Sequence, residues 1–129
     1  MAFYVDTSAF VKLVAREESS TELRDWVATS HPELVASDLL RIEALRAARR
    51  LGPEYLVAAR EALRHVTLIA LSTGMCEVAA DLDPSILRSL DAAHLATALS
   101  VGDELEGIVT YDQRLATAAR ALGLAVLHP

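Results

Sequence analysis

The stretch Phe3-Tyr4-Val5-Asp6-Thr7-Ser8 decides how this chain folds. Three apolar residues that favour β-strands run directly into an acid, and a helical pattern begins at Ala9. In an open α/β sheet, ligands bind in the crevice beyond the carboxyl ends of the strands. We therefore expect Asp6 to lie at such an edge and to belong to a binding site. The rest of the chain should then supply its partners.

Length and composition predict a single domain over residues 1–129, large enough to bury roughly two-thirds of its unfolded surface. The apolar fraction of 53% indicates strands buried on both faces or an apolar patch left for a partner. Helices rich in Ala and Leu, in a protein without a partner, account for this apolar fraction equally well. The net charge of −6 argues against a broad basic surface for nucleic acid, and it is compatible with an acidic site that needs a metal ion.

The compartment is predicted from one cysteine and from the absence of long apolar runs. Cys76 has no second cysteine to pair with, which fits a reducing cytoplasm. Asp6 interrupts the N-terminus too early for a signal peptide, and no apolar run approaches the roughly 18 residues that a membrane helix requires. We expect a cytoplasmic protein that does not bind membranes.

Strand patterns alternate with helical patterns along the whole chain. After the first strand, further strands are expected at Leu34–Ser37, Val66–Leu71, Ile108–Tyr111 and Leu124–Leu127. An acidic loop is expected at 102–107, and a helical stretch is expected after Pro84-Ser85. This alternation predicts an α/β fold in which helices cover both faces of a parallel sheet, connected by right-handed crossovers.

Four of the 18 acids lie in apolar surroundings instead of polar runs. Asp6 and Asp112 each follow a strand, Asp91 opens an apolar helix, and Glu43 lies within the apolar helix Leu39–Leu45. Carboxylates packed close together repel one another unless a cation is present. Hard oxygen ligands are those that Mg²⁺ or Mn²⁺ takes. The four acids together therefore indicate a metal site.

Each of these acids also has an ordinary structural explanation. The three aspartates could cap helices, and Glu43 could pair with Arg46 or Arg50, which lie on the same helical stripe. In the functional interpretation, Arg46 and Arg50 instead form a short rim beside the acid cluster that contacts phosphates. His94 lies one turn after Asp91 and could line the site, although a structural histidine is the simpler explanation.

Four segments resemble, in order, the motifs of PIN domains. They are Val5–Ala9, the helix-borne Glu43, Leu90–Ala98 and Val109–Asp112, and together they cover essentially the whole chain. The short chain is similar to the VapC-type toxins of prokaryotic toxin–antitoxin pairs.

The resemblance implies a three-layer α/β sandwich with a central five-stranded parallel sheet, and a Mg²⁺- or Mn²⁺-dependent endoribonuclease. Asp6, Glu43, Asp91 and Asp112 would be the catalytic, metal-binding quartet, in which Asp6 and Asp91 hold the metal and the other two help directly or through water. Ser8 and Thr110 match the hydroxyl positions that support it. Besides RNA, the implied partners are a small antitoxin and a second copy, in a homodimer or a toxin–antitoxin hetero-oligomer.

Other classes with this architecture fit less well. A receiver-type signalling domain needs a lysine after a late strand, and the only lysine, Lys12, lies in the first helix. A haloacid-dehalogenase-type phosphatase needs an acid two residues after Asp6, where this chain has Ser8. A non-catalytic PIN-like module that binds RNA or protein remains the alternative. Four clustered acids argue against it, because like charges have little use in a purely structural core.

Overall fold

Five parallel strands form the centre of the molecule, in the order β3-β2-β1-β4-β5, in a computed structural model that describes residues 1–129. The strands are β1 (Ala2–Val5), β2 (Glu33–Ser37), β3 (Val66–Ile69), β4 (Leu105–Val109) and β5 (Val126–Leu127). The predicted α/β class and the five-stranded parallel sheet are confirmed.

Seven α-helices and one short 3-10 helix connect the strands. They are α1 (Thr7–Val14), α2 (Ser20–Ser30), α3 (Leu39–Leu51), α4 (Pro53–Leu63), α5 (Thr73–Asp81), α6 (Ser89–Val101), the 3-10 helix η1 (Gly102–Glu104) and α7 (Gln113–Ala121). None of these helices has the length and apolar character needed to cross a bilayer.

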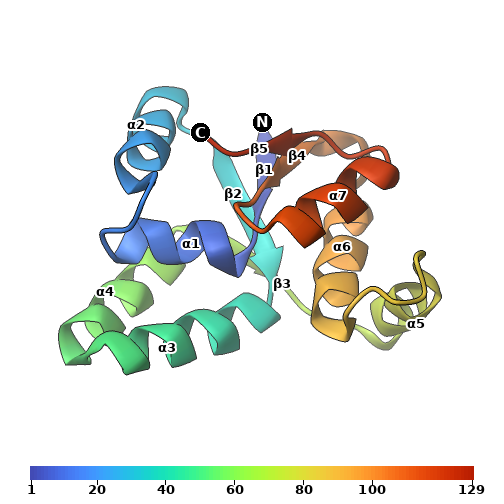
Figure 1. Cartoon of the computed structure of the whole chain (residues 1–129), viewed down its shortest axis with the longest axis horizontal. Helices are drawn as coiled ribbons and strands as arrows, with labels where there is room; N and C mark the ends of the chain where they lie inside the picture. Colours follow the sequence, from blue (N-terminus) through green and yellow to red (C-terminus); the bar gives the residue numbers. More distant parts are fainter.

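The helices divide between the two faces of the sheet, as Figure 1 shows with α1 to α4 on one side and α5 to α7 on the other. Two aromatic neighbours on β1 illustrate this division. Phe3 meets Trp26 of α2 edge to face, with ring centroids 5.0 Å apart. Tyr4 meets His94 of α6. Successive side chains of a strand point to opposite faces, so β1 is covered by helices on both sides.

The connections change direction between β1 and β4. The chain runs from β1 outward through β2 to β3, then crosses back to β4 and continues to β5. With right-handed crossovers, the two halves place their helices on opposite faces. The carboxyl ends of β1 and β4 therefore border a topological switch point, the usual position of a ligand site in such sheets. Asp6 and Thr110 follow these two strands directly.

The predicted acidic loop at 102–107 is wrong in its second half. Leu105 to Val109 form β4, and Leu105 and Gly107 pair with Ala2 and Phe3 of β1. The acidic residues of this segment predict a loop, because the exposed side chain of Glu106 does not indicate a strand. The backbone around Glu106 is nevertheless part of the sheet. Pairing with a neighbouring strand outweighed local composition here.

Two other predicted strands are shorter in the structure, and one predicted helix begins later. The strand predicted at Val66–Leu71 ends at Ile69, and the one predicted at Leu124–Leu127 is reduced to Val126–Leu127 at the sheet edge. The helix predicted after Pro84-Ser85 is absent, because that segment makes only a turn in which the Leu87 N–H bonds to the Pro84 carbonyl. The helix begins later, at Ser89.

Gly107 leads to a test of the fold. A Cβ there would lie 2.9 Å from the Ala125 carbonyl oxygen, which accepts the Ile108 N–H bond between β4 and β5. We expect Gly107→Ala to lower the free energy of unfolding by about 1–3 kcal/mol through this overpacking, measured by urea denaturation.

The matched control is Gly74→Ala in α5, where the nearest atom to an added Cβ is 3.8 Å away. This change should be neutral or should stabilise the helix by about 0.5–1 kcal/mol. Equal effects at the two positions would contradict the close approach of β5 to Gly107.

Candidate active site

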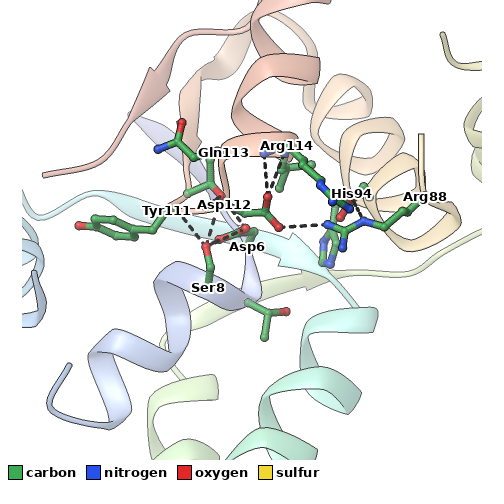
Figure 2. Close-up of polar contacts among 12 residues, drawn as sticks. Asp6, Ser8, Arg88, His94, Tyr111, Asp112, Gln113 and Arg114 are labelled. Carbon is green, nitrogen blue, oxygen red and sulfur yellow. Dashed lines mark hydrogen bonds and ion pairs between the residues drawn. The ribbon is translucent and has the colours of Figure 1, made fainter. Parts of the chain in front are cut away.

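Asp6 lies at the end of β1 in a cradle of donors and is only 4% exposed. Its Oδ1 accepts hydrogen bonds from the Ala9 N–H at 3.0 Å and from the Ser8 hydroxyl at 2.8 Å. Its Oδ2 accepts a bond of 2.6 Å from the Thr110 hydroxyl. Asp6 is thus the N-cap of α1, and the same carboxylate is held in one orientation (Figure 2).

The two hydroxyls that hold Asp6 are themselves fixed by the backbone after β4. Ser8 Oγ accepts the Tyr111 N–H at 3.0 Å, and Thr110 Oγ1 accepts the Asp112 N–H at 3.0 Å. The turn that follows β1 is therefore joined to the turn that follows β4. The structure places Ser8 and Thr110 in direct contact with Asp6.

This cradle is an unusual place for a charge. Burial raises the pKa of Asp6, and the hydrogen bonds from Thr110, Ala9 and Ser8 offset that shift only in part. All of these donors are neutral. A carboxylate without a cation at bonding distance is costly to bury. An added cation nearby would favour its ionised form.

Glu43 of α3 reaches the site through two bonds from other elements. Its Oε1 lies 2.6 Å from His94 Nε2 and accepts a 2.9 Å bond from the Thr7 hydroxyl. Burial works to raise the pKa of Glu43, but the bonds from His94 and Thr7 outweigh it, so the net direction is downward. Glu43 therefore faces the site as a carboxylate and does not pair with Arg46 or Arg50.

A buried chain of hydrogen bonds sets the proton on His94. The Tyr4 oxygen accepts the Ser37 N–H at 3.1 Å and lies 2.5 Å from His94 Nδ1. Since Nδ1 is the acceptor available to the Tyr4 hydroxyl, the imidazole proton resides on Nε2 and points to Glu43. His94, which is buried, thereby orients a carboxylate from a helix 51 residues away in sequence.

Asp91 and Asp112 share one cation. Arg88 Nε donates to Asp91 Oδ2 at 2.7 Å, and Arg88 Nη2 donates to Asp112 Oδ2 at 3.2 Å. Figure 2 shows the Arg88 side chain reaching from the start of α6 toward Asp112. Asp112 also caps α7 by accepting the N–H groups of Arg114 and Leu115, whereas α6 is not capped by Asp91.

The four acids face one cavity of about 380 Å³, whose polar lining includes Asp6, Glu43, Asp91, Asp112, Arg88 and His94. Oxygen donors of this kind suit Mg²⁺ or Mn²⁺. As the side chains lie, no three His, Cys, Asp or Glu residues are arranged to hold a metal ion together. The donor set fits such an ion in its chemistry, while Arg88 supplies the positive charge in the observed arrangement.

The sequence-predicted residues divide into two places. The cavity is lined by Asp6, Ser8, Glu43, Asp91 and Asp112. Thr110 does not line it, but its hydroxyl bonds to Asp6. Arg46 and Arg50 do not line it, and together with Arg49 they border a separate surface hollow on α3.

Arg88 and Thr7 were not among the residues predicted from sequence, and a structural role was preferred there for His94. Arg88 had a usable signal, because it stands three residues before Asp91, a spacing that favours ion pairs near a helix. Thr7 had no signal that distinguishes it from an ordinary residue at a helix start.

Comparison with known proteins identifies the family of this chain. The family model "PIN domain" matches residues 3–121. Among curated relatives from Mycobacterium tuberculosis, ribonuclease VapC46 is 44% identical over 128 residues, covering 99% of this chain and 98% of the relative. Ribonuclease VapC35 is 42% identical over 130 residues, covering 98% of this chain and 96% of the relative.

Two solved structures share the fold. Mycobacterium tuberculosis VapC20, described as a toxin that cleaves the Sarcin-Ricin loop, has a TM-score of 0.78 at 21% identity, covering 98% of this chain and 99% of its own. A toxin–antitoxin complex from Klebsiella pneumoniae has a TM-score of 0.73 at 20% identity, covering 98% and 97%. At these identities the likeness concerns the fold alone.

The raised pKa of Asp6 predicts a pH-dependent stability. A folded-state pKa above the unfolded value gives a stabilising contribution at low pH that is lost as pH rises through the folded pKa. At pH 7 and without metal, Asp6→Asn should therefore raise the melting temperature, by roughly 3–5 °C for each kcal/mol gained. The difference from wild type should close below about pH 4, where the carboxyl is protonated in both states.

Differential scanning calorimetry across this pH range, with EDTA present, measures the effect. Asp103→Asn serves as the control, because Asp103 is exposed in η1. A metal-free Asp6→Asn protein that melts below wild type at pH 7 would contradict the burial argument.

Proposed function

Because this chain belongs to the PIN-domain family, and within it to the VapC ribonucleases, we propose that it hydrolyses RNA phosphodiester bonds as the toxin of a toxin–antitoxin pair. The observation that carries the proposal is the convergence of four carboxylates on one cavity at the switch point between β1 and β4. A non-catalytic binding module would gain nothing from four carboxylates placed close together, because like charges repel one another.

In the proposed chemistry, the four acids have two roles toward a metal ion. Asp6 and Asp91 would hold a Mg²⁺ or Mn²⁺ ion, with Glu43 and Asp112 helping directly or through water. When bound, such an ion supplies charge neutralisation at the phosphate and lowers the pKa of a water. Asp6 is preorganised by its cradle, and His94 keeps Glu43 turned toward the cavity. Preorganised groups need little rearrangement during the reaction.

RNA would approach over the exposed arginines of α3. Arg46 and Arg50 lie on the helix that carries Glu43, and both are solvent-exposed. In a chain with a net charge of −6, this local basic surface is where a phosphate backbone meets the least repulsion. We assign Arg46 and Arg50 to phosphate contacts that position the RNA without selecting its sequence.

The proposed protein partner is a small antitoxin, in a cytoplasmic complex that also contains a second copy of the toxin. The structural neighbour from Klebsiella pneumoniae is a toxin–antitoxin complex. Several large apolar side chains are exposed on helices and on the turn before α6, which suits a chain with partner surfaces. They include Ile42, Leu51, Val57, Val78, Ile86 and Leu90.

Removing single charges from the quartet tests the reaction. Asp6→Asn and Asp91→Asn should each lower the rate of RNA cleavage by roughly a hundredfold or more, since even outer contacts to a metal commonly cost 10–100-fold. Excess EDTA should stop the wild-type protein. Cleavage is followed by sequencing new RNA ends after incubation with purified protein.

Asp103→Asn is the matched control and should cleave at the wild-type rate. Circular dichroism verifies that each variant is folded. Full activity of folded Asp6→Asn, or of wild type in EDTA, would refute the metal mechanism. If the folded wild type binds RNA and never cuts it, the non-catalytic alternative holds.

The proposed RNA rim predicts a change in salt dependence. Replacing Arg46 and Arg50 together by Gln should weaken RNA binding and reduce the slope of log K against log salt by about 1.4, or roughly 0.7 for each single-strand phosphate contact. Fluorescence anisotropy with a labelled RNA gives both quantities.

Arg60→Gln with Arg64→Gln is the control, because it removes the same charge from an exposed stripe on or beside α4. This pair should leave the slope unchanged. An equal loss of slope in both double variants would show that net charge, and not the α3 surface, governs binding.

A further inference from the structure

We propose that Arg88 is a built-in counter-ion of the active site, which occupies the space between Asp91 and Asp112 in the metal-free protein and is displaced when a divalent ion binds. The inference deepens the proposed function and rests on its metal site. It assigns a role to a residue of this chain that lies outside the acidic quartet.

The geometry of Arg88 is that of a bridge. The guanidinium bonds to one carboxylate at the start of α6 and to another at the start of α7, through Nε at 2.7 Å and Nη2 at 3.2 Å. Asp91 and Asp112 would repel each other without a cation between them. Arg88 thus compensates, within the chain, for the charge that a metal would otherwise neutralise.

Arg88 is also placed so that it can leave. Its side chain is 54% exposed, and it makes no capping bond to α6. Water screens an ion pair on its exposed side, and holding a long side chain costs entropy. The longer bond to the partly exposed Asp112 is therefore weaker than the bond to the largely buried Asp91. Asp6, in contrast, is buried and bonded to three neighbours.

A divalent ion and the guanidinium compete for the same oxygens. As the side chains lie, no three acids are arranged to hold a metal together, and Arg88 spans two of the four. Like charges cannot both occupy this space without strong repulsion. Asp6 is therefore the fixed side of the ion site, and the Asp91–Arg88–Asp112 bridge is its movable side.

Once a divalent ion has displaced it from Asp91 and Asp112, the Arg88 guanidinium takes a second position. Arg88 lines the cavity beside the acids, so the released side chain remains at its rim. A guanidinium there suits the oxygens of a bound phosphodiester, which it can contact through two parallel N–H groups. The same residue balances charge before the ion binds and faces RNA afterwards.

Titration calorimetry with MnCl₂ on the full-length protein tests the competition. Arg88→Gln should bind Mn²⁺ about three- to tenfold more tightly than wild type, since the two ion pairs of Arg88 no longer have to be broken. Arg88→Lys, which keeps the charge and loses the two-sided bridge, should lie between them. Arg114→Gln is the matched control, because Arg114 is an exposed arginine in the first turn of α7 and makes no ion pair.

Melting temperatures give a second readout. Without metal, Arg88→Gln should melt below wild type, because Asp91 and Asp112 then repel each other unscreened. Saturating Mn²⁺ should raise its melting temperature by more than it raises that of wild type, because tighter binding to the native state stabilises more.

The outcomes separate this inference from the proposed function. Equal or weaker Mn²⁺ binding by Arg88→Gln, with binding abolished in Asp6→Asn, would overturn the role of Arg88 and leave the metal site intact. Tighter binding in Arg114→Gln as well would reduce the effect to net charge and also overturn it. If neither wild type nor Arg88→Gln binds Mn²⁺, the metal site itself fails, and the competition fails with it.

Discussion

The buried carboxylate of Asp6 is the constraint on which the rest of the site depends. It ends β1, caps α1, and receives hydroxyl bonds from Ser8 and Thr110. Those two hydroxyls are held in turn by the backbone after β4. One side chain therefore joins the two central strands at the point where the sheet changes direction. The proposed role of Asp6 as a fixed oxygen ligand accounts for the cost of burying its charge.

Around this fixed point, the other acids are arranged with different degrees of freedom. Glu43 is oriented by a buried hydrogen-bond chain from Tyr4 through His94, which leaves its carboxylate facing the cavity. Asp91 and Asp112 are bridged by a half-exposed arginine, and Asp112 also accepts the Arg114 and Leu115 N–H groups at the start of α7. The site thus has a rigid side at the end of β1, and a side that can rearrange through Arg88 where α6 and α7 begin. This asymmetry suits the proposed binding of both a cation and a phosphate backbone in the cavity.

Much of the architecture could be predicted because the strands and helices alternate clearly, and because Asp6 follows a run of three apolar β-formers. The boundaries were less predictable. β4 begins at Leu105, inside a segment whose acidic letters indicate a loop, because its backbone pairs with β1 whatever its exposed side chains are. The segment after Pro84 reads as helical in composition, yet only a turn forms before Ser89.

The sequence by itself determined the fold class and the meeting of strand-end acids, because the carboxyl ends of neighbouring parallel strands share one edge of a sheet. Only the tertiary structure decided which partner each acid has. Glu43 could have paired with Arg46 one turn away, and it bonds instead to His94, 51 residues distant. Arg88 joins two acids from different helices. Such partners depend on how helices pack across the sheet, and the local spacing of residues along the chain does not specify that packing.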